Sequence, residues 1–174
     1  MLVAATGLLT NPASAQNAED KSKRPSPPVE VSQTIAGGAT ISIHYGQPSV
    51  KGRTIGKDLE PKEGQVWRAG ANEATVFETD KAITIEGKPL PAGKYAFFTK
   101  KEGKKWTLIF NKTWDTWGAY EYSKNKSGDA LKVSVNEQKA SSFSEKLIYT
   151  ISPDGNISLN WGDILIRFKA KTAG

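Results

Sequence analysis

Strict alternation between apolar and other residues is the feature that most limits how this chain can fold. From Val29 onward, apolar side chains recur in steps of two, whereas no stretch shows a long helical period. Successive side chains of a β-strand point to opposite faces, so each set predicts a strand with one buried face. The clearest sets are Ile41/Ile43/Tyr45, Tyr95/Phe97/Thr99, Trp106/Leu108/Phe110, Leu131/Val133/Val135, Leu147/Tyr149/Ile151, Ile157/Leu159/Trp161 and Ile164/Ile166/Phe168.

Short turn motifs separate these sets. Gly37-Gly38, residues 89–93 (PLPAG) and residues 153–155 (PDG) are typical of hairpin connections, and Gly162-Asp163 predicts a last tight hairpin. A short helix is expected only within residues 136–144. The pattern predicts an all-β fold, a single antiparallel β-sandwich or jelly-roll-like domain of about nine or ten strands.

The composition excludes several chemistries. The chain of 174 residues has no Cys and a single His, His44. Disulfides, thiolate nucleophiles and iron–sulfur clusters are therefore ruled out, and a zinc site built from several imidazoles is ruled out with them. We expect no metal and no cofactor. The net charge of +6 comes mainly from scattered Lys, with only four Arg. Scattered Lys is typical of a solvated surface, so we expect no nucleic-acid partner.

The N-terminus resembles an export signal. Residues 2–9 are small or apolar and Ala13-Ser14-Ala15 follows, which together predict a signal peptide over residues 1–15. No Lys or Arg precedes Lys21, so we expect the true start to lie upstream of Met1. The apolar run is too short to span a bilayer. We therefore expect an exported protein, periplasmic or extracellular and without a transmembrane segment. Residues 16–28 are expected to be a disordered polar linker, and residues 29–171 the single β domain.

Residues 47–72 interrupt the alternation with a long irregular segment rich in Gly and Pro. Such segments are uncommon in small domains and often carry function. The first candidate patch leads into this segment and includes His44 and Arg53. His44 has the parity of Ser42, opposite to that of Ile43, so it is expected on the polar face. There it is either an exposed surface residue or part of a binding site.

The second candidate patch ends the irregular segment, in the sequence WRAGANE (residues 67–73). In one interpretation Arg68 pairs with Glu73, Asn72 caps a turn and Trp67 packs the loop. In the other, Arg68 binds an anion or a hydroxyl group, and Glu73 acts as hydrogen-bond acceptor or general base. The spacing alone leaves both interpretations open.

The third candidate patch is the aromatic loop over residues 111–122. It begins at Asn111 and includes Trp114, Trp117 and Tyr120. Exposed aromatic rings on a β-sandwich would form a stacking surface for sugars or peptides. Alternatively, Trp117 and Tyr120 fill the end of the core. Both interpretations stay open at this point.

Several of these motifs, in this order, closely resemble an uncharacterised bacterial family known as domain of unknown function 2911. They are PSVKGR (residues 48–53), VWRAGANEAT (66–75), LPAGKYAFF (90–98), FNK (110–112) and WGAY (117–120). The resemblance covers residue 29 to the C-terminus and implies exported bacterial proteins with one β-rich domain and no established activity. Gln47 stands where the family commonly has Arg, and Ala69 where it commonly has Thr, which argues against a role that needs a positive charge at position 47.

Three functions are consistent with these patches. The first is a bacterial envelope module that binds a small polar ligand, a glycan or peptide, or another envelope component. The second is a structural or assembly domain without a ligand. The third is a metal-independent hydrolase or lyase in which Glu73 or Asp115 is the base, His44 the acid and Arg68 the charge stabiliser. The candidate ligand-binding residues are His44, Arg53, Trp67, Arg68, Asn72, Glu73, Asn111, Trp114, Trp117 and Tyr120.

Overall fold

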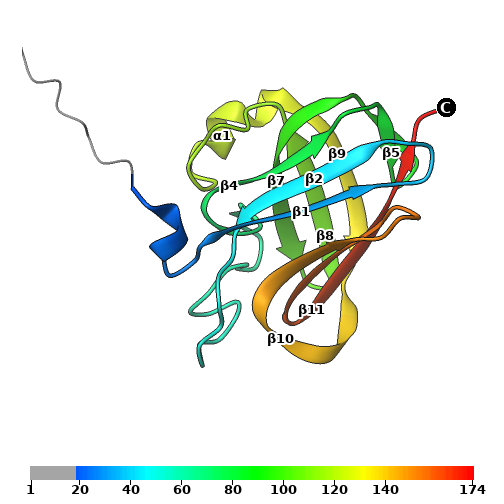
Figure 1. Cartoon of the computed structure of the whole chain (residues 1–174). Helices are drawn as coiled ribbons and strands as arrows, with labels where there is room; N and C mark the ends of the chain where they lie inside the picture. The colour runs from blue at the N-terminus through cyan, green and yellow to red at the C-terminus, as the bar shows by residue number, and fades with distance from the viewer. Residues whose placement is uncertain (1–18) are drawn as a thin grey trace, which may run out of the picture.

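The computed structural model describes residues 19–174, and the predicted signal peptide therefore lies outside the described residues. The described chain is an antiparallel β-sandwich of two sheets packed together (Figure 1), which confirms the predicted fold class. Its strands are β1 (Pro28–Thr34), β2 (Thr40–Gly46), β3 (Val66–Trp67), β4 (Ala71–Thr79), β5 (Ile83–Ile85), β6 (Lys88–Leu90), β7 (Gly93–Glu102), β8 (Lys105–Asn111), β9 (Asp129–Asn136), β10 (Gln138–Ile151) and β11 (Asn156–Thr172).

The larger sheet has the order β1-β2-β4-β7-β8-β9, and the short strand β3 pairs with β7. Its registers follow the alternation in the sequence. Ile43 of β2 lies opposite Phe77 of β4, and Phe97 of β7 lies opposite Phe110 of β8. All four side chains are buried. One face of this sheet therefore forms an apolar layer, as the period of two requires.

The smaller sheet has the order β10-β11-β5-β6 and differs from the sequence-based expectation at two points. Gly162-Asp163 does not close a hairpin, because β11 runs through both residues as one strand of 17 residues. Gly162 instead has a φ of 58° at a shift in the β10–β11 register, which is the geometry of a β-bulge. The helix expected within residues 136–144 is also wrong, since these residues end β9 and begin β10.

The core lies between the two sheets and is built around aromatic rings. Phe97 of the larger sheet contacts Phe168 of β11 at 5.8 Å between ring centroids, and Tyr149 of β10 at 6.3 Å. Phe97 also contacts Phe77 and Phe110 within its own sheet. Aromatic side chains bury large areas, so this contact set holds the two sheets face to face.

A smaller apolar cluster lies on the other face of the larger sheet. Ala74, Phe98 and Ile109 belong to it, and Tyr122 packs against it. Tyr122 begins α1 (Tyr122–Asn125), which continues into a 3-10 helix, η2 (Lys126–Gly128). The aromatic loop is therefore attached to the outer face of the larger sheet rather than to the main core.

The long loop over residues 47–65 is attached to the smaller sheet by hydrogen bonds. The backbone N–H of Val50 donates to the carbonyl of Glu145 at 2.8 Å, and that of Leu147 donates to Pro48 at 3.1 Å. Trp161 of β11 donates its indole N–H to the carbonyl of Glu60 at 2.8 Å. The loop is therefore held in place along its length, although it contains no long strand or helix of its own.

Residues 19–27, which we call the N-terminal strap, fall in the segment predicted as a disordered linker over residues 16–28, and they form local structure; residues 16–18 lie outside the described residues. They contain a 3-10 helix, η1 (Lys21–Lys23), capped by the side chain of Asp20. The strap then continues directly into β1 beside β2 (Figure 1). Its basic side chains find a partner on β4, described below, which explains why a polar and Pro-rich sequence is ordered here. Across residues 19–174, no helix combines the length and apolar character needed to cross a membrane.

Candidate functional site

The turn between β3 and β4 positions the second candidate patch. Ala69 and Asn72 both have positive φ values, 52° and 64°, a conformation that Asn tolerates better than Ala. The carbonyl of Ala69 accepts hydrogen bonds from the hydroxyls of Thr75 at 3.0 Å and of Tyr149 at 2.6 Å. The indole N–H of Trp67 donates to the carbonyl of Gly70 at 3.1 Å. The turn is therefore fixed against the buried side of the sandwich, and its polar side chains point outward.

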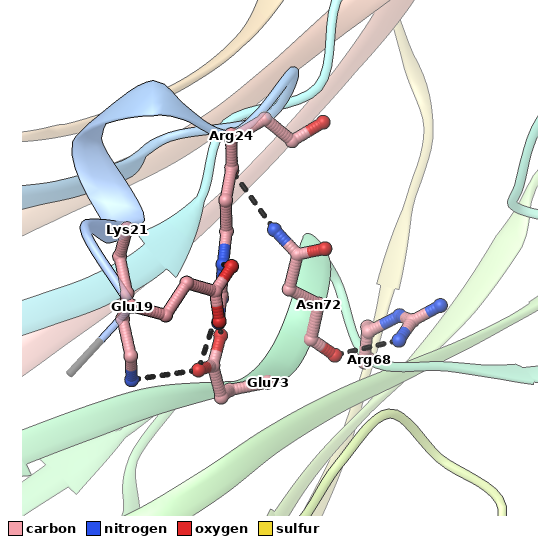
Figure 2. Close-up of polar contacts among 7 residues, drawn as sticks. Glu19, Lys21, Arg24, Arg68, Asn72 and Glu73 are labelled. Carbon is pink, nitrogen blue, oxygen red and sulfur yellow. Dashed lines mark hydrogen bonds and ion pairs between the residues drawn. The ribbon is translucent and has the colours of Figure 1, made fainter. Parts of the chain in front are cut away.

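Glu73 follows this turn and is bound by the N-terminal strap (Figure 2). Its carboxylate accepts from Lys21 Nζ at 2.8 Å and from Arg24 Nη1 at 2.9 and 3.1 Å. Arg24 also forms a two-pronged bond with Glu19, at 2.8 and 2.7 Å. Its side chain is only 14% exposed. The four charged groups form one network that joins the strap to β4.

The network sets the protonation of Glu73. Partial burial by itself raises the pKa of Glu73, but hydrogen bonds from Lys21, from its own backbone amide and from Arg24 outweigh that effect and lower the pKa to about 2. Hydrogen bonds to Glu19 and then to Glu73 raise the pKa of Arg24 above its usual value. A carboxylate that is paired twice and has so low a pKa is poorly suited to accept a proton near neutral pH.

Arg68 does not pair with Glu73, so this part of the structural interpretation of the second patch is wrong, whereas Trp67 is buried and packs the turn as that interpretation expects. Figure 2 shows the Arg68 guanidinium pointing away from the Glu73 carboxylate, with Nη1 donating to the carbonyl of Asn72 at 2.6 Å. The Asn72 side chain donates to the carbonyl of Ser26 in the strap at 2.9 Å. The sequence contains both charges, but the left-handed turn at Asn72 directs them to different partners.

The aromatic loop exposes its rings. Trp114, Trp117 and Tyr120 are 39%, 51% and 73% exposed, so the alternative in which Trp117 and Tyr120 fill the core is wrong. Each ring has one cation above it. Lys94 lies 5.0 Å from the Trp114 centroid, Arg24 5.7 Å from Trp117 and Arg68 5.8 Å from Tyr120. The three rings therefore have three different cationic neighbours, and of the three only Tyr120 lines a hollow beside the β3–β4 turn.

Two of the candidate residues lie elsewhere or serve the fold. Asn111 is fully buried, and its amide donates to the carbonyl of Asn125 at 2.8 Å and to Asp129 at 2.7 Å. It also accepts from the backbone of Thr113 at 2.8 Å, so it ties down both ends of the aromatic loop. His44 lies on the outer face of β2, with Nδ1 3.6 Å from Glu30. The hypothesis that His44 acts as acid beside Glu73 as base gains no support. His44 lies beside Glu30, whereas Glu73 is bound by Lys21 and Arg24.

A cleft of about 200 Å³ opens beside the β3–β4 turn. Its two arginines are Arg53, from the long loop, and Arg68, from the turn. Trp161 reaches it from the smaller sheet and Ser26 from the strap. The full lining is Ser26, Pro48, Arg53, Leu59, Glu60, Trp67, Arg68, Gly70, Ala71 and Trp161.

A second hollow of about 180 Å³ shares three lining residues, Glu60, Trp67 and Arg68, with the cleft. It extends to Ala119 and Tyr120 of the aromatic loop. Arg68 therefore contributes to both hollows, the cleft on one side and the hollow that reaches the exposed ring of Tyr120 on the other. The two hollows adjoin at Glu60, Trp67 and Arg68, and we refer to the pair, from Ser26 to Tyr120, as the groove.

The groove gathers four of the ten candidate residues, namely Arg53, Trp67, Arg68 and Tyr120. Asn72 and Glu73 flank it but are bound to the strap. Sequence reasoning missed Glu60 and Trp161, which also line the groove. The alternation predicts a core position for Trp161. No local sequence pattern indicates that its indole N–H bonds to a loop residue 101 positions away. Within residues 19–174, no three acidic or His side chains lie close enough together to hold a metal ion.

The fold and the groove define a two-sheet β domain with a small arginine-lined cleft. The chain belongs to the family described as protein of unknown function (DUF2911), whose model matches residues 26–170. No curated protein and no solved structure matches the chain. The matched span begins inside the strap, at the residue whose carbonyl binds Asn72.

Proposed function

We propose that this protein is a binding module for a small polar ligand, a glycan or peptide fragment, which lies in the groove between Ser26 and Tyr120. One observation carries the proposal. Three motifs that are separate in the sequence, around Arg53, Arg68 and Tyr120, meet at two adjoining hollows. The ring of Tyr120 is strongly exposed there. Apolar walls with a few convergent polar groups are the usual make-up of small-ligand sites.

The proposal extends to where the protein acts. The apolar run at residues 2–9 and the Ala13-Ser14-Ala15 motif support export, and the ligand would then be a component of the bacterial envelope. The form of the hydrolase or lyase alternative in which Glu73 is the base loses support, because Glu73 is held by Lys21 and Arg24 with a pKa of about 2. Binding needs no free base, and we therefore favour it.

The test is an NMR titration of the ¹⁵N-labelled protein with neutral and charged mono- and disaccharides and with dipeptides. We expect saturable shifts of the indole N–H signals of Trp67 and Trp161, which line the cleft, and none for Trp106, which bonds to Glu137 away from it. Tyr120→Ala should weaken binding about two- to tenfold, the usual effect of one aromatic contact. Trp114→Ala removes a ring of the same loop that is 39% exposed and lines neither hollow, and it is the matched control. If no compound shifts the two cleft signals, the proposal is wrong, and a structural or assembly role takes its place.

A further inference from the structure

We propose that the groove selects ligands with an oxyanion, a carboxylate or phosphate group, which binds between Arg53 and Arg68. This inference rests on the proposed function and specifies the chemistry of its ligand. Both arginines are lining residues of the same cleft of about 200 Å³, and the Arg68 guanidinium also lies over the ring of Tyr120 in the adjoining hollow. In residues 19–174, neither Arg53 nor Arg68 forms an ion pair with a carboxylate, whereas Arg24 is paired with both Glu19 and Glu73.

Both arginines are held in place by neutral groups. Arg53 donates from Nε to the carbonyl of Val50 at 3.1 Å and from Nη2 to that of Ser49 at 2.8 Å. Arg68 donates from Nη1 to the carbonyl of Asn72 at 2.6 Å. A carbonyl fixes the direction of a guanidinium without cancelling its charge. The two cations are therefore oriented before any ligand arrives, which reduces the conformational entropy lost on binding.

Most of the hydrogen-bonding capacity of these two side chains is not used within residues 19–174. A guanidinium has five N–H donors. Arg53 uses two of them on the described chain and Arg68 uses one, which leaves three plus four, or seven, of their donors. Planar forks of N–H donors match the paired oxygens of carboxylate and phosphate groups and bind them more strongly than neutral acceptors.

The walls of the cleft favour such a contact. Trp67 and Trp161 are almost fully buried, and Leu59 and Pro48 add further apolar surface. Charge-assisted hydrogen bonds are stronger where the surroundings are less polar than water. Glu60 is the one carboxylate residue in the lining, and its Oε2 accepts from the backbone amide of Lys62 at 3.0 Å. The two arginines thus outnumber the acidic group that shares their cleft.

The dimensions limit the size of the ligand. The cleft has a volume of about 200 Å³. That is room for one acidic group with a few attached atoms, and a ring attached to it would extend into the second hollow toward Tyr120. The chemistry points to a small acidic compound, such as a sugar acid or a sugar phosphate.

The experiment compares inorganic phosphate, glucuronate and glucose as probes at constant ionic strength, set with sodium chloride. The indole N–H signals of Trp67 and Trp161 report binding. We expect saturable shifts with phosphate or glucuronate and binding at least tenfold weaker with glucose. The phosphate and glucuronate arms show which oxyanion is preferred. Arg53→Gln and Arg68→Gln should each weaken binding at least tenfold. Arg167→Gln should leave it unchanged, because Arg167 lies on β11 and lines neither hollow.

The outcomes separate this inference from the proposed function. If glucose or a neutral dipeptide shifts the cleft signals as strongly as glucuronate, the groove binds ligands but the oxyanion inference is wrong. The inference is equally wrong if Arg167→Gln weakens binding as much as the two cleft variants, because a general charge effect then explains the result. A thermal melt of each variant verifies folding. Arg53 is exposed on a loop, so its variant remains informative even if Arg68→Gln unfolds.

Discussion

At the scale of single residues, Glu73 illustrates how position changes the role of a side chain. The residue lies where a catalytic base would be sought, beside a turn with Trp, Arg and Asn. Its carboxylate instead accepts hydrogen bonds from Lys21 and Arg24, which lie about 50 positions earlier in the chain. A group stabilised in its ionised form contributes to folding only while it is ionised.

This predicts how the stability of a Glu73→Gln variant depends on pH. The pKa of Glu73 is lowered from 4.5 to about 2 in the folded protein. The contribution of the ionised Glu73 side chain to the free energy of unfolding is therefore complete above about pH 5 and is lost as the pH falls toward 2. The side chain is 44% exposed, so after allowance for solvent screening the loss is roughly 0.5–1 kcal/mol. We expect the melting temperature at pH 7 to fall by about 1–4 °C.

The measurement is a series of thermal melts of both proteins from pH 7 to pH 2, in which the difference should vanish at the acidic end. Glu121→Gln is the control, because Glu121 pairs only with its neighbour Lys124 on the surface of α1. An equal difference at pH 7 and pH 2 would show that the side chain acts by packing and not by its charge.

Asn111 leads to a different prediction at the same scale. Its buried amide makes three hydrogen bonds that hold both ends of the aromatic loop. Asn111→Ala leaves these partners unsatisfied, at a cost of roughly 2–3 kcal/mol. We expect a loss of roughly 4–12 °C in melting temperature and faster hydrogen exchange across residues 112–128. A variant that melts like the parent would contradict this structural role.

At the scale of elements, the N-terminal strap contributes to the wall of the cleft. Ser26 lines the cleft, Arg24 lies over the Trp117 ring, and Asn72 bonds to the Ser26 carbonyl. The strap is also held by the ion pairs of Lys21 and Arg24 with Glu73, which salt weakens by screening. The strap is therefore the element whose attachment should respond most to ionic strength.

We predict that the double variant Lys21→Ala/Arg24→Ala releases the strap. Proteolysis within residues 19–27 should become at least several times faster, while the melting temperature changes by only about 1–4 °C. Lys23→Ala is the matched control, because Lys23 pairs only with Asp20 in the same short helix. Limited trypsin digestion cannot compare these variants fairly, since each loses a cleavage site, so a protease without specificity for basic residues is required. Unchanged cleavage in the double variant would show that the Pro-rich part alone holds the strap.

The sequence predicts most of the strands and few of the contacts between distant segments. Ile41, Ile43 and Tyr45 identify β2 because burial on one face leaves a period of two. Gly162 is misleading, because the same residue type serves a turn and a bulge. The strap is missed for another reason. Its order depends on Glu73, and no local pattern indicates a partner so far along the chain.

The candidate groove is predictable to a similar degree. Arg53, Trp67, Arg68 and Tyr120 are found because charged and aromatic residues in irregular segments have few structural uses. Their grouping is not predictable, since it requires the path of the loop over residues 47–65. That path depends on bonds to Glu145 and Trp161, which belong to the other sheet. Asn111 shows the opposite case. It is a polar residue predicted to bind a ligand, but it is buried and stabilises the fold.

At the scale of the whole molecule, one aromatic core joins both sheets. Phe97 contacts rings from β4, β8, β10 and β11. We predict that Phe97→Ala lowers the free energy of unfolding by roughly 3–5 kcal/mol. Because the core is shared, the sheets should still unfold in a single transition. Denaturant titrations followed by tryptophan fluorescence and by far-UV circular dichroism should therefore coincide. Two separate transitions would show that the sheets are independent units.

The lining of the cleft also has a consequence for the order in which the molecule assembles. Ser26 and Trp161 both contribute to it, although they are 161 − 26 = 135 positions apart in the chain. Contacts between such distant segments form late, because the intervening chain must first be brought together. A ligand that requires the intact cleft cannot bind a chain still lacking β11. During synthesis, such a ligand would therefore recognise only finished molecules and would add its stabilisation after the last strand is in place.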